Sequence, residues 1–147
     1  MSHAYANNYL HCVFSTKDRA PSIPKDLQAK LWAYLKGIAR NLDIPLIAVG
    51  GTENHIHLLL RLPATMPLAT AIQKLKANSS RWLNQHRPGF EWQPGYAAFS
   101  VSPSSLAPVL TYICRQEQHH ATRDFDEEFH AMLAKAGIAP GADLPFT

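Results

Sequence analysis

Short apolar runs alternate along the chain with longer segments in which apolar residues recur at helical spacing. Residues 9–14, aromatic and β-branched, predict a strand that ends before a proline-containing loop. Helical spacing from Lys25 predicts a helix to about Leu42. Two further apolar runs, 44–49 and 55–62, predict a β-hairpin in which Gly50-Gly51 closes the first strand.

The second half of the chain also alternates between predicted helices and a predicted strand. Pro67 opens a helix that ends at His86-Arg87-Pro88-Gly89, and residues 96–101 predict another strand. A helix is expected from Leu106 to about His119, and a last one over 125–136, stopping at Gly137.

The order strand, helix, strand, strand, helix, strand predicts an α+β fold. It is the ferredoxin-like split βαββαβ arrangement, an antiparallel sheet with two helices on one face, here followed by additional C-terminal helices. A chain of 147 residues fits one domain, 1–147. Because this sheet carries many unrelated activities, the function must be argued from particular residues.

Composition narrows the class of protein. With 46% hydrophobic and 17% charged residues the chain is expected to be globular. It has neither a secretory leader nor an apolar run of membrane-spanning length, so a cytoplasmic protein without a membrane partner is expected. Cys12 and Cys114 have no spacing that indicates a zinc knuckle or a disulfide framework.

Charge is unevenly distributed. Residues 61–123 hold seven Lys or Arg against two Glu, whereas five of the six charged residues from Asp124 onward are acidic. A basic middle favours a polyanionic partner, which an acidic C-terminal helix and tail from about 124 could cover when nothing is bound. Ordinary solvated charge explains the pattern equally well.

The segment Asn54-His55-Ile56-His57 carries a candidate metal site. Alternate residues of a strand face the same side, so His55 and His57 can converge on one ion while Ile56 faces the core. In a chain with eight His this spacing is only weakly specific, and two half-buried strand histidines are the simpler interpretation of the pair alone.

Tyr112 and Gln116 strengthen the metal hypothesis. They lie one turn apart on the predicted helix, so a phenol that could act as nucleophile and an amide oxygen that could act as third ligand share one face. A tyrosine at such a position is more often a packed amphipathic residue.

Several ordered blocks then suggest a family. They are Val13-Phe14-Ser15-Thr16-Lys17, Ala48-Val49-Gly50-Gly51 leading to Asn54-His55-Ile56-His57-Leu58-Leu59, Gly95-Tyr96-Ala97-Ala98-Phe99-Ser100-Val101, Tyr112-Ile113 before Gln116-Glu117 and His119-His120, and Phe125-Asp126-Glu127-Glu128-Phe129. From about Tyr9 to Ile138 the chain resembles the single-tyrosine HUH transposases of bacterial insertion sequences and their relatives associated with repetitive extragenic palindromes.

The resemblance implies that His55, His57 and Gln116 bind Mg²⁺ or Mn²⁺ and that Tyr112 is the nucleophile. It implies cleavage and rejoining of single-stranded DNA through a 5′-phosphotyrosine link, recognition of a hairpin or palindrome, and a prokaryotic homodimer whose tyrosine helix can come from either subunit. Two imidazoles suit Mn²⁺ better than Mg²⁺. Arg115 and Gln118 depart from the residues expected in many relatives.

Candidate DNA contacts are the cations of the basic middle, with two tryptophans as possible stacking platforms. Trp82 shares the apolar face of its helix and is more often core. The residues concerned are Lys74, Lys76, Arg81, Arg87 and Arg115, with Trp82 or Trp92 for stacking.

Two other functions fit parts of the pattern. A non-catalytic nucleic-acid-binding module on the same sheet would need exposed aromatic residues on its central strands, where the segment around His55 supplies histidine and leucine. A Zn-dependent hydrolase could use His55, His57 and the pair His119-His120. That pair could instead be a polar helix terminus.

Overall fold

The protein is described here from a computed structural model, which describes residues 5–120 and 123–138. Its helices and strands follow the predicted order. The strands are β1 Tyr9–Ser15, β2 Leu46–Gly51, β3 His55–Arg61 and β4 Ala97–Ser100. The helices are α1 Lys25–Asn41, α2 Leu68–His86, α3 Leu106–Cys114, α4 Gln116–His119 and α5 Phe125–Lys135, with short 3-10 turns at Lys17–Arg19 and Pro103–Ser105.

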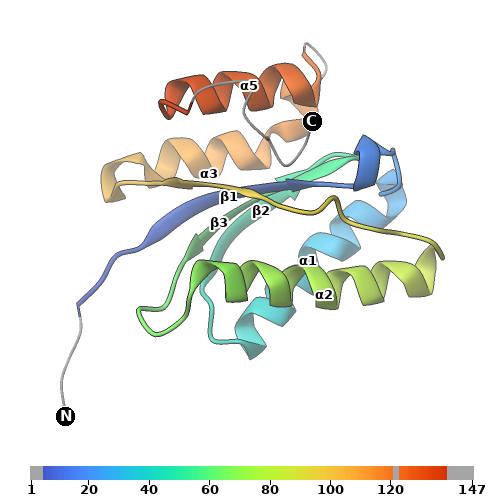
Figure 1. Cartoon of the computed structure of the whole chain (residues 1–147), viewed down its shortest axis with the longest axis horizontal. Helices are drawn as coiled ribbons and strands as arrows, with labels where there is room; N and C mark the ends of the chain where they lie inside the picture. The colour runs from blue at the N-terminus through green and yellow to red at the C-terminus, as the bar shows by residue number, and fades with distance from the viewer. Residues whose placement is uncertain (1–4, 121–122, 139–147) are drawn as a thin grey trace.

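The four strands form one antiparallel sheet in the order β2-β3-β1-β4, which confirms the α+β split arrangement. Helices α1 and α2 cover one face of the sheet, and α3 and α5 lie over the other (Figure 1). The expected additional C-terminal helices therefore make a third layer.

Strand β3 divides its side chains between these layers. Ile56, Leu58 and Leu60 are fully buried in the large hydrophobic core. Leu59 belongs instead to a smaller cluster with Ile113 of α3. Because strand side chains alternate, His55 and His57 lie on the same face of β3 as Leu59, the face covered by α3 and α5. Ile56 lies on the opposite face, in the large core, as predicted.

The glycine pair ends the first strand of the hairpin, as the sequence predicted. Gly50 and Gly51 are the last two residues of β2, and the turn follows at residues 52–54. A Cβ on Gly50 would stand 2.3 Å from the carbonyl oxygen of Ile113. The glycine is therefore needed because the α3 backbone approaches the sheet closely at this point.

The predicted helix 106–119 is interrupted. Arg115, with φ −108° and ψ 23°, leaves helical geometry and separates α3 from α4. Its N–H still donates to the carbonyls of Thr111 and Tyr112, so this backbone donor stays hydrogen-bonded although the helix ends here. Gln116, directly after the break, is almost fully buried.

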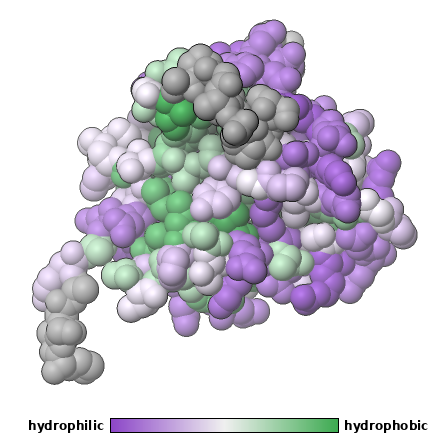
Figure 2. All heavy atoms as spheres, viewed as in Figure 1, coloured by the Kyte–Doolittle hydropathy of each residue, from purple (hydrophilic) through white to green (hydrophobic). Residues whose placement is uncertain are grey.

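The outer surface is mixed. On the face seen in Figure 2, apolar side chains gather near the middle and hydrophilic side chains surround them. None of the helices in the described ranges is long and apolar enough to cross a membrane.

Candidate metal and nucleophile site

His55 and His57 are fully buried between the sheet and the C-terminal helices. The Nδ1 atom of His55 lies 3.0 Å from Thr52 Oγ1 and 2.9 Å from Asn54 Oδ1. The Nδ1 atom of His57 lies 2.8 Å from Nε2 of His11 on β1. These partners fix both rings, and both Nε2 atoms are directed at groups from α4 and α5.

Gln116 reaches the site as the sequence predicted. Its Oε1 lies 3.0 Å from His55 Nε2, and its Nε2 donates to the Tyr112 carbonyl at 3.4 Å. The amide oxygen therefore lies beside the histidine pair, the position expected of a third ligand. Its role as a ligand remains a prediction.

Glu128 of α5 is a site residue that the sequence interpretation missed. Its side chain is fully buried, and Oε1 lies 3.2 Å from His57 Nε2, 3.5 Å from His55 Nε2 and 3.0 Å from His120 Nε2. One signal could have found it: Glu128 interrupts the apolar face of α5 between Phe125 and Met132, where a carboxylate needs a partner.

The donor set fits a divalent ion. Ligand atoms of His55, His57 and Glu128 all lie within 4.8 Å of one another, and all three residues are buried. Two imidazole nitrogens with a carboxylate oxygen suit Mn²⁺, Zn²⁺ or Fe²⁺, and the oxygen of Gln116 adds a hard donor.

Tyr112 stands beside this cluster. Its phenol donates a short hydrogen bond to Glu128 Oε2, and its ring lies edge-on to His57 with centroids 5.8 Å apart. Burial, followed by the Glu128 hydrogen bond and charge, raises the pKa of Tyr112 above its ordinary value. The free phenol is thus protonated and needs an acceptor for its proton when it attacks.

Burial also determines the charge state of the histidines. It lowers the pKa of His57 from 6.5 to about 4, although the Glu128 carboxylate opposes the shift. Burial and the neighbouring His57 lower the pKa of His11 to about 3. Burial tends to raise the pKa of Glu128, but its hydrogen bonds to His120, His55 and His57 together hold it well below the usual range. Neutral imidazoles and an ionised carboxylate are the ligand forms of these groups.

The predicted DNA contacts lie in two places. Lys74, Arg81 and Arg87 are exposed on or just after α2, across the sheet from the histidines, whereas Arg115 is exposed beside α3. Lys76 is half-buried, and its ammonium donates to the carbonyls of Gln93 and Gly95, both at 2.7 Å. Lys76 therefore holds the 93–95 loop in place.

The tryptophans are engaged within the fold. Trp82 is half-buried and stacks on Tyr34, with centroids 5.2 Å apart. Trp92 packs edge-on against Phe14 and donates its N–H to Ser79 Oγ. Of the pair after α3, His120 joins the site through Glu128, and the side chain of His119 lies outside the described residues.

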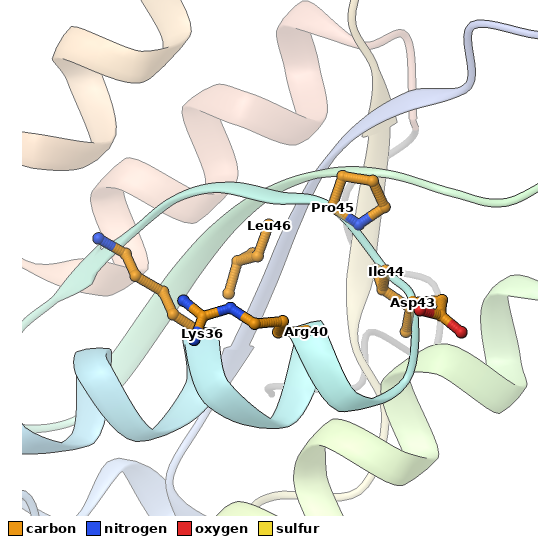
Figure 3. Close-up of a pocket in the computed structure, with 6 residues that line it drawn as sticks. All are labelled: Lys36, Arg40, Asp43, Ile44, Pro45 and Leu46. Carbon is orange, nitrogen blue, oxygen red and sulfur yellow. The ribbon is translucent and has the colours of Figure 1, made fainter.

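The described part of the acidic segment does not cover the α2 cations. Helix α5 lies on the other face of the sheet, where Asp126 pairs with Arg19 at 2.5 Å. Residues 139–147, with Asp143, lie outside the described residues. A hollow of about 390 Å³ between the end of α1 and the start of β2 is lined by Lys36, Arg40 and Leu46 and by none of the site residues (Figure 3).

Two solved structures are similar to this chain in fold. A crystal structure of a candidate transposase from Deinococcus radiodurans R1 has a TM-score of 0.63 and 24% identity, over 79% of this chain and 96% of that one. A REP-associated tyrosine transposase bound to a REP hairpin has a TM-score of 0.60 and 14% identity, over 95% and 87%. Identities this low show a shared fold. A comparison with curated proteins found no match.

The sequence itself gives the family. The family described as "Transposase IS200 like" matches residues 4–116, which include both histidines, Tyr112 and Gln116 but not Glu128. Since the match covers most of the chain, the protein belongs to the IS200-like transposase family.

Proposed function

We propose that this transposase cleaves and rejoins single-stranded DNA, with Tyr112 as its nucleophile and a divalent ion beside it. The observation that carries the proposal is the shared carboxylate: Glu128 faces the histidine pair with one oxygen and accepts the Tyr112 phenol with the other. One carboxylate would thereby join a buried metal site to a half-buried nucleophile.

Cleavage would proceed by attack of the Tyr112 phenol oxygen on the scissile phosphorus. The new bond to phosphorus forms as the bond to the 3′ oxygen breaks, which leaves a 5′-phosphotyrosine and a 3′-hydroxyl. The phenol proton passes toward Glu128 Oε2, its present acceptor, and the departing 3′ oxygen gains a proton. Reversal by another 3′-hydroxyl rejoins the strands without loss of bond energy.

His55 and His57 would hold the ion, with oxygen donors from Gln116 and Glu128. When bound, Mg²⁺ or Mn²⁺ supplies Lewis-acid stabilisation of the charge that develops on the phosphate. The chain itself orients the ligands, through Thr52, Asn54 and His11, and excludes water from the histidines by burying them.

A hairpin-bearing single strand is the proposed substrate, as the relative that was solved with a REP hairpin suggests. The exposed cations Lys74, Arg81, Arg87 and Arg115 would contact its phosphates. A homodimer is also proposed. Tyr112 lies against Glu128 of its own chain, so one subunit brings the nucleophile and the proposed ligands together.

The experiment is a denaturing gel. The protein is incubated with end-labelled, hairpin-bearing single-stranded DNA and Mn²⁺, and a covalent protein-DNA adduct is expected. Tyr112→Phe should abolish the adduct yet still bind Mn²⁺, because the phenol is not among the proposed ligands. Tyr34→Phe, an exposed tyrosine of α1, is the matched control and should form the adduct normally.

The same gel tests the competing functions. DNA cleavage that persists in Tyr112→Phe would contradict the proposal and favour a metal-dependent hydrolase. His120, which lies 3.0 Å from Glu128, could be a ligand in such an enzyme. Binding of DNA with no cleavage by the wild-type protein would favour the non-catalytic module. Activity with Mg²⁺ and none with Mn²⁺ would count against the ligand set.

A further inference from the structure

A groove of about 560 Å³ opens directly beside Tyr112, between the β4 edge, α3 and α5. Its volume is within the range of small-ligand sites, about 300 to 1,000 Å³. His11 and Tyr112 form the end next to the metal cluster, and the groove continues along α5 to Lys135. Glu128, Met132 and Lys135 share this side of α5 because they are spaced three or four residues apart.

The lining combines flat apolar surface with positive charge. Phe99, Val109 and Met132 contribute the apolar part, and Phe99 lies edge-on to His11 with centroids 6.1 Å apart. Among the described residues of the lining, Arg123 and Lys135 carry charge and none is a carboxylate. Burial and Glu128 raise the pKa of the Tyr112 phenol, and the Arg123 side chain partly opposes the rise.

This pattern matches one nucleotide of an unpaired strand. A base has an apolar face that stacks on aromatic surface, and the phosphates on either side of it need cations. A base paired within a duplex could not enter a groove of this size. Tyr112 at the end of the groove would then meet the phosphate attached to the bound nucleotide.

We infer that this groove binds the unpaired nucleotide adjoining the scissile phosphate, its base on Phe99 and its phosphates near Arg123 and Lys135. The inference rests on the proposed function, because it assigns the substrate of the same tyrosine. It explains why the strand must be single at the cut: the base has to leave any helix to enter the groove.

The test measures base-dependent binding without cleavage. Fluorescence anisotropy compares fluorescein-labelled (dT)10 with a ten-unit abasic strand that has the same phosphates. The wild-type protein should bind (dT)10 about tenfold more tightly than the abasic strand. This ratio is the gain in affinity expected when one base stacks on an aromatic side chain. Phe99→Leu, which keeps apolar bulk but removes the ring, should reduce this preference to about twofold.

Charge is tested separately. Lys135→Gln should weaken binding of both strands by the same factor, since a phosphate contact ignores the base. Tyr34→Leu and Lys30→Gln remove an exposed aromatic residue and an exposed lysine from α1, on the far face of the sheet. Both controls should bind like wild type.

Equal binding of the two strands by wild type would overturn the inference, as would a Phe99→Leu variant that keeps the full preference. A variant that ends at Ile138 tests whether residues 139–147 of the chain itself occupy the groove. A lower unfolding temperature with unchanged strand binding would assign the groove to residues 139–147 and overturn the inference. If the protein forms a normal DNA adduct but binds (dT)10 and the abasic strand equally, the assignment of the groove is wrong and the proposed function still stands.

Discussion

Glu128 is the one carboxylate among the buried polar residues in the described ranges, and every histidine of the cluster except His11 lies within 3.5 Å of it. An ionised carboxylate is expensive to bury unless it is paired. The cost is offset here by donors from β3, α3 and the segment before α5. A residue with this many partners orders the site even before an ion binds.

At the residue scale, Glu128→Gln should weaken Mn²⁺ binding by about tenfold or more, because it replaces an anionic ligand with a neutral one. Calorimetric titration of the protein with Mn²⁺, without DNA, measures the effect. Circular dichroism melting verifies that the variant is folded.

The matched control is Glu127→Gln, which removes the same charge from the exposed neighbour on α5. It should change the Mn²⁺ dissociation constant by less than about twofold, as expected for a screened surface charge. If both variants lose affinity equally, Glu128 acts only through the overall charge of the helix and is not a ligand.

At the scale of elements, the placement of α3 on the sheet depends on Gly50. Gly50→Ala would bring a methyl group into the Ile113 carbonyl, which is backbone and cannot rotate away. We expect a loss of about 1 to 3 kcal/mol in the free energy of unfolding, measured by urea titration. Adduct formation should fall as well, because α3 carries Tyr112.

Gly37 provides the comparison. It lies inside α1 with nothing within 4 Å of an added Cβ, so Gly37→Ala should stabilise the protein by about 0.5 to 1 kcal/mol. Equal effects of the two substitutions would show that close approach is not the reason for Gly50.

The elements also show how far sequence patterns reach. Alternation in β3 predicts that His55 and His57 share a face, because a strand's geometry is local. Glycine permits both turns and close contacts, so the pattern at Gly50-Gly51 could not distinguish them. The break at Arg115 has no Gly or Pro to signal it, and the contact of Glu128 with His57 depends on how α5 returns across 71 residues to the sheet.

At the scale of the whole molecule, stability should depend on pH through the buried histidines. The unfolded chain protonates His11 and His57 as the pH falls below about 6.5, but the folded protein resists this until about 4 for His57 and about 3 for His11. The unfolded state therefore binds more protons in this window, and folding stability falls as the pH drops.

In EDTA, we expect the free energy of unfolding to decrease by about 3 to 4 kcal/mol between pH 7 and pH 5, because each of the two histidines contributes about 2 kcal/mol. Urea unfolding at both values measures the change. His11→Gln should make it smaller, whereas His130→Gln, at an exposed position of α5, should leave it unchanged. A wild-type protein equally stable at both pH values would contradict this account.

The three-layer architecture also limits where a cut can fall. If the α2 cations hold a hairpin stem, the strand leaving it must pass around the edge of the sheet to reach α3, which carries Tyr112 and lies on the opposite face (Figure 1). One helical layer is about 10 Å thick, so the path through two layers is at least about 20 Å. An unpaired strand can extend to about twice the duplex rise of about 3.4 Å per nucleotide, so at least about three unpaired nucleotides would have to separate the stem from the phosphate that is cut. The thickness of the fold would then set the minimum number of nucleotides between the hairpin stem and the cleavage site.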